Sequence, residues 1–379
     1  MHTALRHARA LALKTRPVHL TFFATRRCNA RCAFCFYEAA REAEAGPAEL
    51  SVDEVRRVAR TTGPLLWVLF SGGEPFLRDD LVELSGIFHD ESAPTFLTYP
   101  TNGLLPEVVA GAVEGILRRC GESVVVVKLS LDGVGERHDA LRGVPGAWAK
   151  VMETYERLAA LAARHPRLEI GVNTVYCARN EGEMDRLLDV VHGLGAVTSH
   201  TLTLVRGGAR DASFQDVDLD RYRAASMRFA ARWSSPRGRF ARFAGARLKA
   251  AQDVVQRELV HRTMSRGRRQ TPCYAGRLNL VLTERGELHP CEGRWDLSFG
   301  NVRDAGYDVA AMLRSAAGRR VRRAVAGQGC FCSNECNTMT NILFNPARHP
   351  GLVRAWLRLR LGSAAGGGAG AGRIEPSMT

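Results

Sequence analysis

Short apolar runs and amphipathic segments alternate along residues 18–205, and this alternation constrains the fold more than any other feature of the chain. The predicted strands are 18–24, 65–70, 95–100, 123–131, 168–176 and 200–205. The predicted helices between them are 51–60, 79–88, 106–119, 146–164 and 181–194. Nearly continuous apolar strands are typical of a parallel sheet buried on both faces. Six consecutive βα units therefore predict an α/β fold built on a partial (β/α)6 TIM-like barrel, with a doubly wound sheet as the second choice.

The rest of the chain divides by composition. We expect the barrel domain to occupy residues 1–210 and a helical connector to occupy 211–266. A small cysteine-rich α+β domain, made of a β-hairpin and a helix, is predicted for 267–347. Residues 348–379 are predicted to form a C-terminal helix and a disordered tail, because "LGSAAGGGAGAGRIEPSMT" has too few apolar side chains to build a core.

The formal net charge is +14, and it comes almost entirely from arginine. These arginines are scattered along helix-like segments such as "GRRVRRA", so we interpret them as a solvated basic surface. Nucleic acid is not an expected partner, while contact with an anionic substrate or a membrane surface stays open. No run of about 18 apolar residues is present, so no transmembrane span is predicted. The basic N-terminus lacks the apolar core of a signal peptide, which predicts a cytoplasmic protein.

The chain has ten cysteines, and eight of them fall into two groups, Cys28–Cys35 and Cys273–Cys336. Cys120 and Cys177 stand alone in apolar stretches and are predicted to be buried packing residues. A disulfide framework is not expected without a secretion signal. Clustered thiols in a reducing compartment more often bind a metal or an iron–sulfur cluster.

The first group, "CNARCAFC", follows the first predicted strand, at the end where α/β barrels carry their active sites. A cubane [4Fe–4S] cluster is normally held by four thiolates. Three thiolates, from Cys28, Cys32 and Cys35, leave one iron open to a molecule that is not a protein side chain. A zinc site with a fourth ligand from elsewhere is the alternative.

The C-x3-C-x2-C loop after the first strand, with Phe34 directly before the third cysteine, resembles the hallmark of the radical S-adenosylmethionine (SAM) enzymes. The resemblance covers residues 17–205 or so. It implies that the three cysteines hold a [4Fe–4S] cluster and that the methionine part of SAM chelates the open iron. It also implies that later loops of the barrel contact SAM.

Those loops carry suitable residues. After the second strand, "SGGEP" contains glycines that let the backbone approach a ligand and a carboxylate that can accept from an amine. Arg142 has a guanidinium that matches a carboxylate, although it can equally be a surface arginine. His138 and Asp139 are weaker candidates. The predicted SAM contacts are Phe34, Gly72, Gly73, Glu74, Pro75, Asn102 in "PTNG", Ser130 and Asp132 in "SLDG", Arg142, and Asn173 in "NTV".

The second cysteine group lies around a predicted hairpin, "LNLVLTERGELHP". The spacing C-x12-G-x4-C through Gly286, followed by "FGNVRD", resembles the SPASM or twitch extension of many radical SAM enzymes. A full SPASM extension has seven cysteines, whereas this region has five, so the resemblance implies a single auxiliary [4Fe–4S] cluster. Its candidate ligands are Cys273, Cys291 and Cys336, with Cys330 or Cys332 as the fourth. A structural zinc site is the alternative.

The resemblance implies that a reductant such as flavodoxin or ferredoxin reduces the open-site cluster, which cleaves SAM to a 5′-deoxyadenosyl radical that abstracts hydrogen from a substrate. The auxiliary cluster would relay an electron. We expect a small-molecule substrate that is oxidised, epimerised or rearranged. His138, His289, Glu292, Trp295 and Asp296 are possible substrate-side residues.

Two other functions stay open. One is a maturase that modifies a peptide or protein side chain, which the SPASM-like extension favours. Only about 16 residues precede the first strand, so no N-terminal leader-binding domain is expected. The other is an iron–sulfur electron carrier, which needs no SAM pocket and would yield no 5′-deoxyadenosine.

Overall fold

A nine-stranded sheet organises the fold, in the order β6-β5-β4-β3-β2-β1-β7-β8-β9. The computed structural model describes residues 7–37, 48–234, 243, 245–327 and 329–365. Strands β1 to β6 are all parallel to their neighbours. They are β1 (His19–Thr25), β2 (Trp67–Gly72), β3 (Phe96–Thr101), β4 (Val124–Ser130), β5 (Leu168–Tyr176) and β6 (Val197–Leu204). The α/β fold with a partial barrel of six parallel strands is thereby confirmed.

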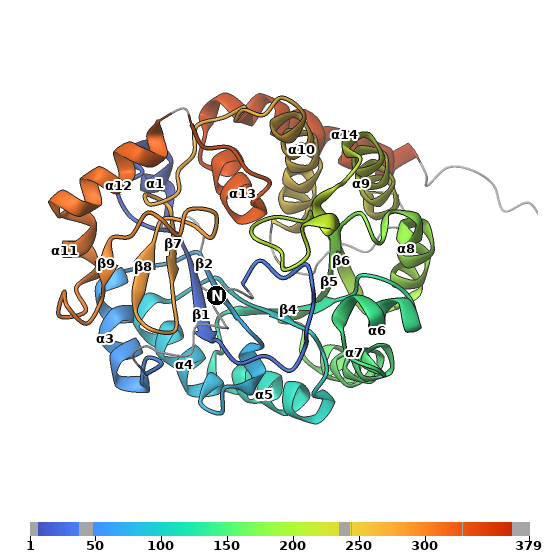
Figure 1. The fold of residues 1–379 in the computed structure, drawn as a ribbon, viewed down its shortest axis with the longest axis horizontal. Helices are drawn as coiled ribbons and strands as arrows, with labels where there is room; N and C mark the ends of the chain where they lie inside the picture. The colour runs from blue at the N-terminus through green and yellow to red at the C-terminus, as the bar shows by residue number, and fades with distance from the viewer. Residues whose placement is uncertain (1–6, 38–47, 235–242, 244, 328, 366–379) are drawn as a thin grey trace, which may run out of the picture.

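The helices between these strands run around the outside of the sheet (Figure 1). They are α3 (Val52–Thr62), α4 (Leu81–Ser92), α5 (Pro106–Arg119), α6 (Glu136–Arg142), α7 (Ala147–Arg164) and α8 (Met184–Gly193), and α1 (Ala8–Leu13) precedes β1. Helix α3 begins with a capping box, in which Ser51 N donates to Glu54 Oε2 (2.9 Å) and Glu54 N donates to Ser51 Oγ (3.3 Å). Local capping and apolar periodicity therefore fix these helices.

Each barrel strand presents alternate residues to two environments. On β4, Val125, Val127 and Leu129 are fully buried in the core shared with the outer helices. Val126 and Lys128 alternate with them and face the inside of the barrel, where both line a cavity. The inner face of β4 therefore places a charged side chain, Lys128, beside the apolar Val126.

The open side of the six-stranded arc is closed by helices from later in the chain. Helix α9 (Leu219–Ser234) packs on β6, and α10 (Ala246–Ser265) lies against α9, α13 (Glu335–Leu343) and α14 (His349–Ala365). Figure 1 shows α10 and α13 between β6 and β7. Residues 361–365 of the predicted tail continue helix α14, and the remainder of that tail lies outside the described residues.

The predicted hairpin consists of β7 (Asn279–Leu282) and β8 (Glu287–His289), and β9 (Gly300–Asn301) pairs antiparallel with β8. Strand β7 pairs in parallel with β1, His19 opposite Asn279, so the hairpin continues the barrel sheet. Helices α11 (Val309–Arg314) and α12 (Ala316–Ala326) follow. None of the described helices has the length and apolar character needed to span a bilayer.

Candidate active site

The loop after β1 carries the first three thiols at the carboxyl end of the strand. Its backbone is held by Cys35 N, which donates to Cys32 O (3.1 Å), and by Arg31 N, which donates to Arg142 O (2.9 Å). Cys32 is buried, and Cys28 and Cys35 are half-buried. The three side chains lie in one apolar cluster with Ala30, Phe34, Leu104, Leu141, Ala147 and Val205.

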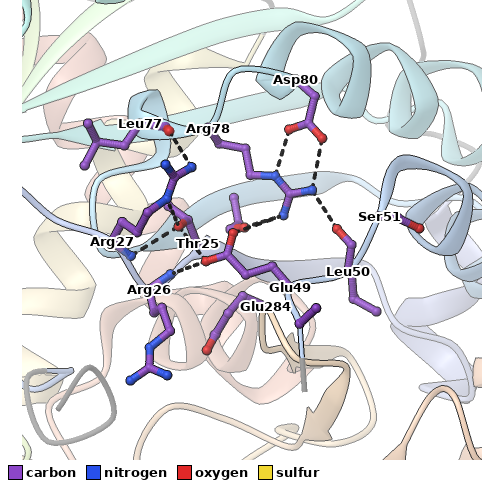
Figure 2. Close-up of polar contacts among 12 residues, drawn as sticks. Thr25, Arg26, Arg27, Glu49, Leu50, Ser51, Leu77, Arg78, Asp80 and Glu284 are labelled. Carbon is purple, nitrogen blue, oxygen red and sulfur yellow. Dashed lines mark hydrogen bonds and ion pairs between the residues drawn. The ribbon is translucent and has the colours of Figure 1, made fainter. Parts of the chain in front are cut away.

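A polar network fixes the base of this loop (Figure 2). Thr25 Oγ1, at the end of β1, donates to Glu49 Oε1 (2.7 Å) and accepts from Arg27 N (3.1 Å). Arg26 N donates to the same Glu49 oxygen (3.1 Å), and Arg27 Nη2 donates to the carbonyl of Leu77 (2.7 Å). The loop is thus tied to the turn that follows β2.

Arg78 completes this network from the other side (Figure 2). Its buried guanidinium donates to the carbonyls of Ala24 (2.8 Å) and Leu50 (2.6 Å) and pairs with Asp80 (2.7 Å). Because a buried guanidinium is costly unless its donors are satisfied, these contacts hold the turn after β2 in one position against β1.

The two glycines of "SGGEP" are needed for contact with the cysteine loop. Gly73 N donates to Thr25 O (2.8 Å) and Glu74 N donates to Arg27 O (2.8 Å). A Cβ on Gly73 would stand 2.6 Å from the carbonyl carbon of Arg27, and Gly72 has φ 111°. The sequence suggests that these glycines let the backbone approach a ligand. In the structure they let two backbone segments of the protein approach each other.

Glu74 is buried, and both of its carboxylate oxygens are engaged. Oε1 accepts from Thr101 Oγ1 (2.9 Å) and Phe76 N (3.3 Å), and Oε2 accepts from Asn102 N (2.8 Å). Burial raises the pKa of Glu74 to about 7, against the opposing effect of these donors. Asn102 Nδ2 in turn donates to Asn29 Oδ1 (2.7 Å) and lies 3.8 Å from Cys28 Sγ. Glu74 therefore positions Asn102 beside the cysteine loop, and its predicted contact with SAM stays a prediction.

Arg142, at the end of α6, is buried between the cysteine loop and β4. Its guanidinium forms an ion pair with Asp132, and Nη1 lies 3.7 Å from Cys32 Sγ. Its Cζ lies 5.7 Å from the centre of the Phe34 ring. Burial alone would lower the pKa of Arg142. The negative charges of Asp132 and Cys32 have the larger combined effect and raise that pKa. Asp132 also accepts from Val175 N (2.7 Å), so one ion pair joins two of the predicted SAM contacts.

Ser130 and Asn173 stand opposite each other at the ends of β4 and β5, and Thr201 of β6 is the next residue in that row. Asn173 Oδ1 accepts from Thr203 Oγ1 (2.9 Å), and Thr203 also bonds to Glu335 Oε2 (3.1 Å). Glu335 lies on α13 and lines the cavity. Ser130 and Asn173, two of the predicted SAM contacts, therefore border the inside of the barrel.

The second cysteine group divides in two. Burial raises the pKa of the Cys291 thiol to about 12, and the charges of Cys273, Cys332 and Cys330 add to the shift. Burial also raises the pKa of the Cys336 thiol, and the next largest effects on that pKa come from the charges of Glu292, Arg206 and Glu335. The side chain of Cys336 lines the cavity inside the barrel. Cys273, Cys330 and Cys332 line one small cavity, and Cys273 also packs in the apolar cluster of Cys291, whereas Cys336, which was a predicted ligand, lines the barrel cavity. Among the described residues, no three His, Cys, Asp or Glu side chains form a compact group able to hold a single metal ion.

The weaker candidates have structural partners. His138 is buried and Nδ1 accepts from Asp132 N (3.3 Å), while Asp139 accepts from Gly146 N (2.6 Å) and Trp148 N (2.7 Å) before α7. His138 and Asp139 therefore stabilise the loop around Arg142.

The candidates next to Cys291 are also engaged. His289 Nδ1 contacts Leu297 O (2.9 Å), and its ring packs against Trp295. Asp296 pairs with Arg294 (2.6 Å), and Glu292 pairs with Arg206.

Known proteins resemble this chain in sequence and in fold. The family model for the radical SAM superfamily matches residues 22–190. AdoMet-dependent heme synthases are similar, from Methanosarcina barkeri (32% identity over 210 residues, 54% of this chain and 55% of that one) and Nitratidesulfovibrio vulgaris (27% over 300 residues, 75% of each). The chain thus spans about half the length of the heme synthase from Methanosarcina barkeri. The crystal structure of anSMEcpe with AdoMet and the Cp18Cys peptide has a similar fold (TM-score 0.56, 16% identity, 92% of this chain and 99% of that one).

Residues 22–190 of the chain belong to the radical SAM superfamily. Radical SAM enzymes use SAM and a [4Fe–4S] cluster, and the residues on the loop after β1 fit that pair. Three thiols share one apolar cluster, which supplies three of the four thiolates of a cubane and leaves one iron open. Arg142 and Asn102 place N–H groups beside the sulfurs of Cys32 and Cys28.

Sequence reasoning about this radical SAM enzyme missed a cavity of about 410 Å³ inside the barrel. It is lined by the inner faces of β2 to β6 and by α10 and α13. One signal could have found it: Lys128 is the only charged residue in the apolar strand "SVVVVKLSL". The other lining residues come from helices whose position against the strands no local pattern encodes.

Proposed function

We propose that this radical SAM enzyme abstracts hydrogen from a small molecule held in the barrel cavity. The observation that carries the proposal is the position of the cavity. Lys128, Gly171 and Ser199 form one row of residues across β4, β5 and β6, and Ser130, Asn173 and Thr201 form the row two residues further on. Two residues of strand span about 7 Å, so the cavity lies directly below Ser130 and Asn173, which are predicted SAM contacts.

When bound, the cluster and SAM supply a 5′-deoxyadenosyl radical. The chain itself has three tasks: to hold SAM, to orient the substrate and to exclude water. Arg142 and Asp132 provide buried charges beside the cysteine loop, and Ser130 and Asn173 provide polar groups facing the barrel. Helices α10 and α13 line the cavity on the open side of the arc.

We also propose that Cys273, Cys291, Cys330 and Cys332 hold an auxiliary [4Fe–4S] cluster that relays an electron. Their mutual proximity supports this set. Four thiolates complete the ligation of a cubane, so such a cluster would exchange electrons rather than bind substrate. A one-electron reductant such as flavodoxin or ferredoxin would then be the partner.

A volume of about 410 Å³ is suited to a small organic ligand. Relatives named heme synthase and Fe-coproporphyrin III synthase support a small-molecule substrate, and precursors of these tetrapyrroles are the first compounds to test. A peptide substrate is the second candidate, because the similar fold of anSMEcpe holds AdoMet together with a peptide.

The test is anaerobic. The reconstituted enzyme is given SAM and dithionite, and 5′-deoxyadenosine is measured with and without each candidate substrate. We expect a small molecule to raise the yield and to be converted. Val126→Trp, inside the cavity, should abolish that increase, whereas Val108→Trp, on the exposed surface of α5, should not. No 5′-deoxyadenosine under any condition would refute the enzymatic proposal, and conversion of peptides alone would favour the second candidate.

A further inference from the structure

The cavity has an apolar end and a polar end. Trp67, Phe96, Trp233 and Phe243 contribute aromatic rings to its wall. Closer to the carboxyl ends of the strands, the wall includes the polar side chains of Lys128, Ser199, Thr201 and Glu335. A ligand that fills this space must therefore join an apolar body to a polar head.

Lys128 is the cation at the polar end that has no direct ion pair among the described residues. Its Nζ donates to Ser199 Oγ (2.8 Å) and Thr201 Oγ1 (3.2 Å), which are both neutral. Within the described part of the chain, no carboxylate lies within ion-pair distance of it. Two hydroxyls satisfy two of its three N–H donors and leave the third for a ligand, while the carboxylates of Asp253 and Glu335 act on its charge without forming an ion pair.

The neighbouring cations are already engaged. Lys249 pairs with Asp253 one turn along α10. Arg257 donates to the carbonyls of Ser226 (2.8 Å) and His200 (3.0 Å). Lys128 is thus the cation of this cavity that is available to a ligand.

The backbone makes room for Lys128 to lie across the sheet. Gly171 stands between Lys128 and Ser199 in the same row of residues. A Cβ on Gly171 would stand 2.7 Å from both Cδ and Nζ of Lys128. A glycine in the interior of a central strand lowers the stability of the sheet. Here the glycine leaves the space in which the Lys128 side chain lies across β5.

A buried ammonium is unfavourable unless an opposite charge compensates it. Burial, followed by the charge of Lys249, lowers the pKa of Lys128 to about 8. An anionic group of a ligand would supply the missing charge and restore the ordinary pKa.

We propose that Lys128 anchors the acidic group of an amphipathic small-molecule substrate, with a carboxylate or phosphate at Nζ and an apolar body between the aromatic rings. This inference rests on the cavity being the substrate site. The acid would sit two strand residues below Ser130 and Asn173, so the acid and the carbons that adjoin it lie at the end of the cavity nearest the predicted SAM site.

Dye binding tests the proposal without any need for turnover. The probes are 8-anilinonaphthalene-1-sulfonate, which has an apolar body and an anionic head, and N-phenyl-1-naphthylamine, which has the same rings without the charge. Binding to the anaerobically reconstituted enzyme is followed by dye emission and by quenching of tryptophan fluorescence. Lys128→Met should weaken the binding of the anionic dye by about tenfold or more, because a buried charge-assisted hydrogen bond is lost. The binding of the neutral dye should change little.

Three variants control this measurement. Lys128→Arg keeps the charge and should keep most of the affinity for the anionic dye. Gly171→Ala should mimic Lys128→Met, because the added methyl displaces the lysine. Lys150→Met removes an exposed lysine of α7 and should change neither dye.

Competition identifies the acid. Displacement of the anionic dye by 1-naphthoate supports a carboxylate, and displacement by 1-naphthyl phosphate supports a phosphate. Displacement by neither, or an equal loss of both dyes in Lys128→Met, would overturn the proposal. The 5′-deoxyadenosine assay is separate, so selective dye binding without SAM cleavage would refute the proposed function and leave the anion site standing.

Discussion

Replacing Gly73 with alanine tests whether contact between two backbone segments holds the cysteine loop. The new Cβ would lie 2.6 Å from Arg27 C and 2.9 Å from Arg26 O, both on the loop that carries the first thiols. Neither neighbour is a flexible side chain, so the loop or the turn after β2 must move.

The cost can be estimated from what that movement breaks. Two backbone bonds join these segments, Gly73 N to Thr25 O and Glu74 N to Arg27 O. Losing both costs about 2 kcal/mol, and the overpacking adds about 1–3 kcal/mol, so we expect a loss of roughly 3–5 kcal/mol. Because the displaced loop carries Cys28, we also expect the enzyme to lose about four irons per chain.

The assay is the thermal midpoint of the reconstituted enzyme, measured by circular dichroism under nitrogen, together with iron per chain. Gly111→Ala is the matched control. Gly111 lies on the exposed face of α5 with nothing near its Cβ position, so the same change should stabilise the helix by up to about 1 kcal/mol. If Gly73→Ala matches the wild type in both midpoint and iron, the close contact does not hold the loop and the reasoning fails.

Three further predictions concern other parts of the molecule. Cys291→Ala should remove about four irons per chain, whereas Cys336→Ala should remove none, and iron analysis distinguishes them. Burial lowers the pKa of His19 from 6.5 to about 4, so the stability held by its neutral form is present above pH 6.5 and is lost as the pH falls toward 4. His19→Phe should therefore reduce the loss of unfolding free energy between about pH 7.5 and about pH 5.5 by about 1 kcal/mol. The unfolding free energy is measured by urea titration at both pH values, and an equal loss in the variant and the wild type would contradict this. Arg303 lowers the pKa of Glu54 to about 2, so Arg303→Met should cost about 1–2 kcal/mol at neutral pH, a difference that vanishes as the pH falls from 4.5 toward 2.

The strands and outer helices could be predicted because their signals are local. Helix α5 begins at Pro106 and ends at Arg119 as expected, and β5 matches its predicted range of 168–176. Proline at a first helical turn and an uninterrupted apolar run are properties of the segment itself. The position of the three-thiol loop after β1 was equally predictable, because its three cysteines lie within eight residues.

The parts that could not be predicted depend on partners distant in sequence. Strand β7 has four residues, and nothing in "NLVL" specifies β1 as its parallel neighbour. Arg142 has the same local sequence signal as a surface arginine, and only the fold places it against Asp132. The glycines of "SGGEP" were located correctly, but their reason, contact with the backbone at Arg27, required the other segment to be in place.

The pairing of β1 with β7 has a consequence for how the chain folds. Strand β1 lies between β2 and β7, and its partner on one side is synthesised about 260 residues after it. Until β7 emerges, β1 presents an unpaired edge that carries buried apolar residues such as Leu20 and Phe22. Such an edge is prone to pair with other chains, so the nascent protein has a long interval during which it depends on chaperones. Truncation before residue 267 would make that interval permanent, and we expect such a fragment to aggregate.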